Sequence, residues 1–263
     1  MKKSRRHALG QHFLASPAVL AKIVSAIGPR EEDVIVEVGA GQGVLTAALA
    51  EKAGRVIAIE KDDRLIPGLR EAVPANVEVV HADALAVDLA GIARRAGARA
   101  LRVAGNIPYS ISSALLFRVL DERSLVADTA FLVQKEVAER VTAGPGSKAF
   151  APLGILLQNE FEARIVFTVA PGSFSPPPEV QSALLVLRRR SSPVLPGAAD
   201  EPFRAFLREA FAERRKMLWK KLARRADAER LAAAYAKVGL ERNVRAEEVP
   251  AATLFALFRA LGS

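Results

Sequence analysis

The chain has 263 residues, and its 38 lysines and arginines against 29 acidic residues give a formal net charge of +9. The absence of cysteine excludes disulfides and zinc–cysteine sites, and three scattered histidines disfavour a histidine-built metal centre. Hydrophobic residues make up 51%, which is typical of a folded globular protein. The sequence contains no apolar run of membrane-spanning length, and its basic N-terminus lacks the apolar segment of a secretion signal. We therefore expect a cytoplasmic protein without a metal site.

Residues 1–190 alternate short apolar runs with helix-like stretches. The expected strands are 33–38, 55–60, 77–83, 101–104 and 129–133, and the expected helices are 43–52, 63–72, 86–96 and 113–120. Apolar strands that alternate with helices indicate a mostly parallel sheet covered on both faces. Two later strands are expected at 163–169 and 182–188, on either side of a proline-rich stretch.

A stretch rich in Ser, Pro and Gly at 191–200 predicts a domain boundary. We therefore expect one domain over residues 1–190 and a second over residues 191–263. Beyond the boundary the pattern is purely helical, with helices expected at 203–225, 227–238 and 251–261. The predicted architecture is an α/β protein with a Rossmann-like sheet and a small all-α C-terminal domain.

The positive charge is concentrated in two segments. Residues 1–10 carry +4 and residues 203–225 carry +7, so the rest of the chain is close to neutral. Such segments are typical of proteins that bind a polyanion such as nucleic acid. The alternative is a solvated helix face and a basic tail, and composition alone does not decide between the two.

A glycine-rich loop follows the first expected strand, in the sequence EVGAGQG over residues 37–43. Gly39 and Gly41 allow a tight turn and close approach of a ligand to the start of a helix. Glu60 at the end of the second strand is placed to accept hydrogen bonds from ribose hydroxyls, and Asp83 at the end of the third can accept from an adenine amine. Val44 stands where a dinucleotide-binding loop has its third glycine. The pattern therefore favours S-adenosylmethionine over a nicotinamide cofactor, and a plain strand-to-helix turn is the alternative.

The fourth strand leads into Asn106, Ile107, Pro108 and Tyr109. The exocyclic amine of adenine is a poor nucleophile because its lone pair is delocalised into the ring. Two acceptors, the side-chain carbonyl of Asn106 and the backbone carbonyl of Ile107, would hold its N–H groups and favour attack on a sulfonium methyl group. Pro108 stiffens the loop, and Tyr109 can stack on an extruded base. The alternative is a turn that merely ends the strand.

These motifs together resemble the small-subunit ribosomal RNA adenine N6,N6-dimethyltransferases (the KsgA/RsmA family). The resemblance covers GQHFL at 10–14, the glycine loop with its two acids, NIPYSISS at 106–113, QKEVAERVTAGPGSKAF at 134–150, FSPPPEVQSALL at 174–185 and FAERRKML at 211–218. The segment GQHFL, the glycine loop with its two acids and NIPYSISS are shared with the wider class, which includes the erythromycin-resistance methylases of the large subunit. The segments AGPGSKAF, FSPPPEVQS and FAERRK are specific to the small-subunit branch and favour it.

The resemblance implies a class I S-adenosylmethionine-dependent methyltransferase that dimethylates two adjacent adenosines in the 3′-terminal hairpin of 16S rRNA, late in subunit assembly. It implies cofactor contacts at His12, Leu14, Gly39, Glu60, Asp83 and Asn106. It also implies that Phe174 packs against the flipped base opposite Tyr109, and that the helical domain and the basic surfaces bind the RNA. We expect a monomer whose partner is the small subunit or its precursor.

Two positions depart from the family pattern. His12 stands where many relatives have Asn, so only a backbone contact or an altered side-chain contact is carried over. The chain reads Phe150-Ala151-Pro152-Leu153-Gly154 where many relatives read YGRLS, which removes an RNA-facing arginine. Two other functions stay open: an assembly factor whose methylation is dispensable, and a nicotinamide-dependent oxidoreductase.

Overall fold

The computed structural model describes residues 11–213 and 216–262. The chain forms two compact units: one comprises the residues up to Ala138 together with Ala163–Arg189, and the other comprises Glu139–Glu162 and the residues from Arg190 onward. The segment Glu139–Glu162, which precedes the expected boundary along the sequence, thus belongs to the same unit as the C-terminal helices. The division of function between residues 1–190 and 191–263 stays a prediction.

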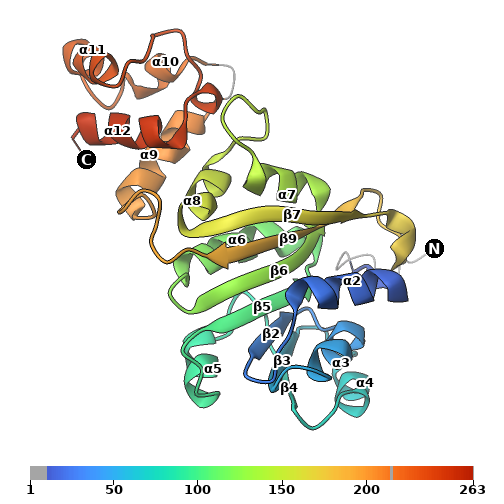
Figure 1. Cartoon of the computed structure of the whole chain (residues 1–263). Helices are drawn as coiled ribbons and strands as arrows, with labels where there is room; N and C mark the ends of the chain where they lie inside the picture. Colours follow the sequence, from blue (N-terminus) through green and yellow to red (C-terminus); the bar gives the residue numbers. More distant parts are fainter. Residues whose placement is uncertain (1–10, 214–215, 263) are drawn as a thin grey trace. The chain divides into compact units, whose positions relative to one another are not determined.

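The first unit is built on a seven-stranded sheet in the order β4-β3-β2-β5-β6-β9-β7 (Figure 1). The strands are β2 (Val34–Val38), β3 (Arg55–Glu60), β4 (Val77–His81), β5 (Leu101–Asn106), β6 (Val126–Gln134), β7 (Phe161–Val169) and β9 (Ser182–Arg189). The strands from β4 to β6 pair in parallel, and β9 is antiparallel to β6. This order confirms the predicted mostly parallel sheet. Because parallel strands share one carboxyl edge, β2, β3, β4 and β5 deliver their last residues to the same side.

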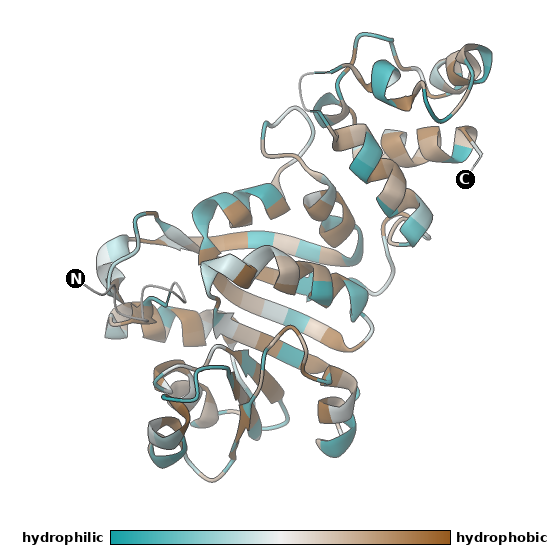
Figure 2. Ribbon diagram, turned by 180° about the vertical axis from the view of Figure 1, so that it is seen from behind, coloured by the Kyte–Doolittle hydropathy of each residue, from teal (hydrophilic) through white to brown (hydrophobic). Residues whose placement is uncertain are grey.

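Helices follow the strands. They are α3 (Val44–Ala50), α4 (Ile66–Ala72), α5 (Leu89–Arg95), α6 (Ser112–Asp121), α7 (Lys135–Thr142) and α8 (Pro152–Glu160). The first four correspond to the predicted helices at 43–52, 63–72, 86–96 and 113–120, whereas α7 and α8 were not predicted. The strands between them carry mostly hydrophobic residues (Figure 2). Ile35 and Val36 are both fully buried although neighbours on a strand point to opposite faces, so β2 is covered on both sides.

One helix before the glycine loop was not expected from the sequence. A small sheet, which joins a strand before this loop to a strand after β7, was not expected either. Helix α2 (Pro17–Ile27) begins at Ser16, whose hydroxyl accepts from the Val19 N–H, and ends at Gly28 in a left-handed conformation. Strands β1 (Phe13–Leu14) and β8 (Phe174–Ser175) pair in an antiparallel fashion, with Leu14 opposite Phe174. Strands of two residues are too short to show a detectable alternation of apolar and polar residues, so they could not be predicted from the sequence.

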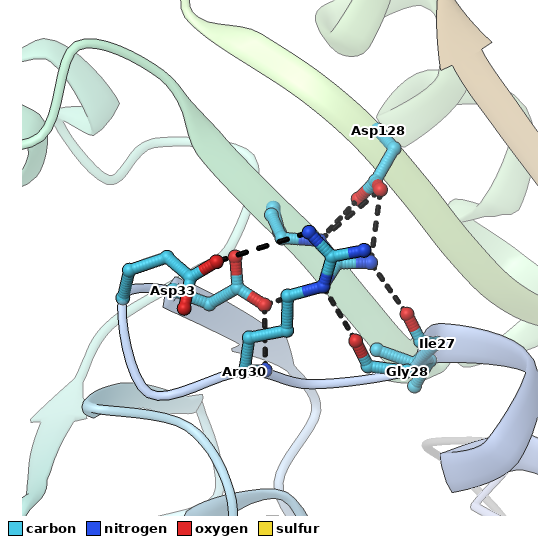
Figure 3. A network of polar contacts seen from close by, with 7 residues as sticks. Ile27, Gly28, Arg30, Asp33 and Asp128 are labelled. Atoms are coloured by element: carbon cyan, nitrogen blue, oxygen red, sulfur yellow. Dashed lines mark hydrogen bonds and ion pairs between the residues drawn. The ribbon is translucent and has the colours of Figure 1, made fainter.

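Arg102 connects the amino-terminal ends of three strands with the end of α2. Figure 3 shows this polar network, with Ile27, Gly28, Asp33 and Asp128 labelled. Its guanidinium donates to the carbonyl oxygens of Ile27 and Gly28, at 2.5 and 3.2 Å, and so satisfies helix-end acceptors. The same group pairs with Asp33 just before β2, at 2.5 Å, and with Asp128 on β6, at 3.0 Å. This network lies at the edge of the sheet opposite the glycine loop.

The second unit contains α8 together with α9 (Glu201–Phe211), α10 (Leu218–Leu222), α11 (Ala228–Lys237) and α12 (Ala251–Ala260). Phenylalanines of α9 and α12 form its aromatic core, with Phe203 ring centroids 5.0 Å from Phe255 and 5.3 Å from Phe258. Among the described residues, no helix of either unit is long and apolar enough to cross a membrane.

The single helix predicted over 203–225 is wrong, because the chain turns after Phe211. Ala212 is extended and Glu213 has a φ of 47°, which ends α9. Tertiary contacts stabilise the break. The Leu218 N–H donates to the Val244 carbonyl, and the Lys221 ammonium donates to the Ala210 carbonyl at 2.8 Å. The apolar stripe that predicted one helix is therefore divided between two helices that pack on each other.

Candidate active site

The glycine loop between β2 and α3 forms the first wall of the site. Gly39, Gly41 and Gly43 all have positive φ values, of 74°, 60° and 83°. A side chain at Gly41 would be strained and would lie 3.1 Å from the Phe13 ring. Because these glycines carry no side chains, a ligand can approach the backbone of the loop closely, as expected for a ligand-binding turn.

Glu60 ends β3 with its carboxylate held by backbone donors. Its Oε2 accepts from the Gly41 N–H at 2.8 Å, and its Oε1 accepts from the N–H groups of Lys61 and Asp62 at 2.8 and 2.7 Å. Glu60 is buried, yet it lines the cavity described below. Three donors set the orientation of the carboxylate in advance, and Oε2, which accepts only from Gly41, keeps one acceptor position for a ribose hydroxyl.

Asp83 lies just beyond β4 and completes the acidic pair predicted from the sequence. Its Oδ2 accepts from the Lys61 ammonium at 2.7 Å, and its Oδ1 accepts from the Leu85 N–H at 2.9 Å. The hydrogen bond from Lys61 is the main reason that the pKa of this carboxyl lies below its usual value. The side chain is about one-third exposed. A charged acceptor is thus available to an adenine amine.

Asn106 ends β5, and its amide has a defined orientation. The Nδ2 donates to the His12 carbonyl at 2.7 Å, whereas the Oδ1 accepts no hydrogen bond from the described residues. The preceding Gly105 is required by packing, since a Cβ there would lie 2.3 Å from the Val38 carbonyl oxygen. The close approach of β5 to β2 places Asn106 beside the glycine loop. The side-chain Oδ1 of Asn106 is there an acceptor that no described residue uses.

Residues after Asn106 form a rigid turn. The Ile107 N–H donates to the Leu132 carbonyl at 3.0 Å, and a Cβ on Gly39 would lie 3.5 Å from the Pro108 ring. The Tyr109 hydroxyl shares a 2.7 Å hydrogen bond with Ser182. Burial raises the pKa of Tyr109, so its ring stands as a neutral phenol.

His12 contacts three parts of this site. Its carbonyl accepts from Asn106, its ring centroid lies 5.5 Å from that of Tyr109, and its Nδ1 is 2.8 Å from the Pro176 carbonyl. His12 therefore links the start of β1 to the Asn106 turn through its backbone carbonyl and its ring.

These residues enclose a cavity of about 580 Å³ within the first unit. This volume is in the range of small-molecule sites. Most of the predicted site residues line it: His12, Gly39, Gly41, Glu60, Asp83, Asn106, Ile107, Pro108 and Tyr109. Ile59, Ala82 and Ala84 add apolar walls between the carboxylates. The donors, acceptors and apolar surfaces fit an adenosyl group.

Leu14 and Phe174 are the two predicted site residues that do not line the cavity. They face each other across the β1–β8 pair. Phe174 is 4% exposed and packs into the hydrophobic core with Leu14 against it. In this conformation the Phe174 ring is part of the hydrophobic core, and its contact with a flipped base stays a prediction.

Two further residues belong to the site although sequence reasoning did not single them out. Lys61 lines the cavity and contacts Asp83, and the only signal for it was its place next to Glu60. Ser182 is fully buried and holds the Tyr109 hydroxyl. It lies in the FSPPPEVQS segment, but only the pairing of β9 with β6 places it behind Tyr109.

The basic segment 203–225 of the second unit is partly neutralised by its own unit. Arg208 pairs with Glu201, Lys216 with Glu213 and Arg225 with Glu209. Lys221 is buried, and desolvation lowers its pKa. Lys220 and Arg224 are exposed and form none of the ion pairs found among the described residues. Arg214 and Arg215, which also counted toward the predicted RNA surface, lie outside the described residues.

Comparisons with known proteins agree with this site. The family model "Ribosomal RNA adenine dimethylase" matches residues 2–262. A curated relative from Geobacter metallireducens, "Ribosomal RNA small subunit methyltransferase A", is 39% identical over 97% of this chain and 95% of its own length. A Burkholderia protein of the same name is 42% identical over 93% of this chain and 88% of its own.

Solved structures give the same result for the fold. The 23S rRNA methyltransferase ErmE has a TM-score of 0.74 and 30% identity over 95% of this chain and all of the other. A dimethyladenosine transferase from Plasmodium falciparum has a TM-score of 0.73 and 25% identity over 94% of this chain and 96% of its own. The fold is therefore the class I methyltransferase fold that the sequence predicted. With the family model matching almost the whole chain, this protein belongs to the ribosomal RNA adenine dimethylase family.

Proposed function

We propose that this enzyme uses S-adenosylmethionine to dimethylate the N6 amines of two adjacent adenosines in the 3′-terminal hairpin of 16S rRNA, late in small-subunit assembly. Family membership supports methyl transfer to ribosomal RNA adenine. The names of the curated relatives, at about 40% identity, support the small subunit as the target. The large-subunit enzyme ErmE is less similar, at 30% identity.

The cofactor would bind in the cavity in front of the glycine loop. Glu60 would accept from the ribose hydroxyls, and Asp83 from the adenine amine. Gly39 and Gly41 would face the methionine portion, together with the backbone of His12 and Leu14 and the side chain of Asn106. Bound there, S-adenosylmethionine supplies an electrophilic methyl group on a positively charged sulfur.

The chain's own residues would prepare the target amine. The Oδ1 of Asn106 and the backbone carbonyl of Ile107 would each accept one N–H of the adenine. This arrangement localises the nitrogen lone pair and directs it toward the cofactor. Tyr109 would stack on the extruded base, with Phe174 on the opposite side. When the N–C bond forms, the bond between the methyl group and the cofactor sulfur would break, and the sulfur would keep the electron pair. The nitrogen would become positively charged, and the carbonyl oxygens of Asn106 and Ile107 would stabilise that charge until its proton passes to water.

One observation carries this proposal. The Asn106 amide donates to the His12 carbonyl, so its own carbonyl oxygen is held toward the cavity that Glu60 and Asp83 also line. A turn that merely ended β5 would need no such orientation. Basic residues at the N-terminus and in the helical unit would hold the RNA phosphates. We further propose that the enzyme works as a monomer in the cytoplasm.

Replacing Asn106 by Ala tests the proposal. The variant should lose at least about 100-fold in methyl transfer to undermethylated small subunits, because an acceptor for the developing charge is removed. Transfer is measured with tritiated cofactor, and the labelled nucleoside is mapped. Asn243→Ala, an exposed position in the helical unit, is the matched control and should retain full activity.

RNA affinity of Asn106→Ala should equal that of the wild type. Full methylation by the variant, or label in a nucleoside other than dimethyladenosine, would refute the assigned role of the turn. Normal small-subunit assembly by the inactive variant would instead favour an assembly factor whose methylation is dispensable.

A further inference from the structure

Lys61 is a cation on the wall of the cofactor cavity that the proposed reaction does not use. Its ammonium donates to Asp83 Oδ2 at 2.7 Å, across the carboxyl edges of β3 and β4. Its backbone is tied to β4 as well, because the His81 Nε2 lies 3.3 Å from the Lys61 carbonyl oxygen. The register that pairs Glu60 with His81 places Lys61 beside the loop that carries Asp83.

The loop after β4 is held independently of Lys61. Arg118 of α6 donates to the carbonyl oxygens of Ala84 and Val87 and pairs with Glu122 at 2.9 Å. Arg118 therefore fixes the backbone of this loop, whereas Lys61 contacts the Asp83 carboxylate itself. Loss of Lys61 would leave the loop in place and remove only one of the two donors that orient the carboxylate.

The orientation matters because a carboxylate binds an amine through particular lone pairs. With Leu85 N–H on Oδ1 and Lys61 on Oδ2, both oxygens are anchored and each keeps one acceptor position. An adenine amine would meet an acceptor that is already aligned and charged. Binding would then cost less side-chain entropy than binding to a carboxylate that is free to rotate.

We infer that Lys61 is a positioning residue for the adenine end of the cofactor site, acting by holding Asp83 toward the base. The inference rests on the proposed function, since it takes the cavity to bind an adenosyl group. It gives this exposed lysine a role in ligand affinity rather than in methyl transfer itself.

The test is a double-mutant cycle on Kd for S-adenosylhomocysteine, measured by calorimetry. Lys61→Met should weaken binding about 3- to 5-fold, the upper part of the range for an exposed ion pair. Lys61→Arg keeps the donor and should bind within about 2-fold of the wild type. Lys22→Met, an exposed lysine of α2, is the charge-matched control and should not change Kd.

The Asp83→Asn background separates this role from a general effect on charge or folding. If Lys61 acts through Asp83, adding Lys61→Met to Asp83→Asn should change Kd less than 2-fold, so the two losses are not additive. Additive losses, unchanged binding in Lys61→Met alone, or tighter binding on removal of the lysine would overturn the inference. Wild-type protein that binds no adenosyl ligand would overturn the proposed function instead.

Discussion

Glu37 is a buried carboxyl group beneath the glycine loop, two residues before Gly39. It is 1% exposed, and its Oε2 has no hydrogen-bond partner among the described residues. Burial, with a smaller contribution from the nearby Glu60 carboxylate, raises its pKa from 4.5 to about 8. The folded protein therefore keeps a proton at neutral pH that the unfolded chain releases.

This proton makes the stability of the protein depend on pH. Between pH 5 and 8 the native state binds one more proton than the unfolded state at this group. The contribution of Glu37 to the free energy of unfolding therefore falls by about 1 kcal/mol per pH unit as the pH rises. Glu37→Gln removes the titration, and its urea unfolding across this pH range should show a correspondingly flatter slope.

Glu32→Gln is the control for that measurement. Glu32 is an exposed residue whose side chain reaches Arg30 only at 3.8 Å, so its replacement should leave the slope unchanged. Equal slopes for Glu37→Gln and the wild type would mean that Glu37 is already ionised in the folded protein.

At the scale of elements, the strand ends of the sheet serve two different purposes. The carboxyl ends of β2, β3 and β5 carry the cavity residues, whereas the amino-terminal ends carry the Arg102 network. Arg102 ties α2 to β2, β5 and β6 through two helix-end carbonyls and two carboxylates. Its side chain is only 17% exposed, so these contacts are screened less than a surface ion pair.

Arg102→Met should lower the free energy of unfolding by about 3 kcal/mol. The variant leaves Asp33 and Asp128 near each other without their shared cation, and it leaves the end of α2 uncapped. Urea unfolding measures the loss, and Arg30→Met, at an exposed pair, should cost less than about 1 kcal/mol. Folded Arg102→Met should keep its Kd for S-adenosylhomocysteine, because the network lies at the opposite edge of the sheet; a weaker Kd would contradict this separation.

At the scale of the whole molecule, the distribution of charge connects the chain to its proposed RNA partner. The net charge of +9 is concentrated at the N-terminus and in residues 203–225, yet three cations of the latter segment are already paired with acids. Lys220 and Arg224 remain exposed in the helical unit. The charge that is free to bind phosphate is thus smaller than the sequence count suggested.

Binding of the 3′-terminal hairpin RNA should weaken steeply with salt, with a log–log slope of about −0.7 to −0.9 per phosphate contacted. The double variant Lys220→Met with Arg224→Met should reduce the magnitude of that slope by between one and two. Filter binding across a salt series measures it. The charge-matched control, Lys22→Met with Lys52→Met, removes two exposed lysines of the first unit and should have a smaller effect. A slope that neither pair changes would place the RNA contact elsewhere.

The sequence by itself determined the strands of the large sheet, the helices α3, α4, α5 and α6 between them, the glycine loop, and Glu60, Asp83 and Asn106 as the polar ends of three strands. It could do so because alternating strands and helices form a parallel sheet, and the carboxyl ends of parallel strands meet at one edge. The chemistry proposed for Asn106–Tyr109 was likewise inferred from residue types, and it stays a prediction.

Only the tertiary structure decided features that depend on contacts between distant segments. The break between α9 and α10 is stabilised by Val244 and by Lys221, which a local helical period does not register. Phe174 lies in the core because β8 pairs with β1, and Lys61 reaches Asp83 because β3 and β4 share a register. Periodicity reports which face of an element is apolar, whereas side-chain partners depend on how the elements pack, and packing is a property of the folded chain.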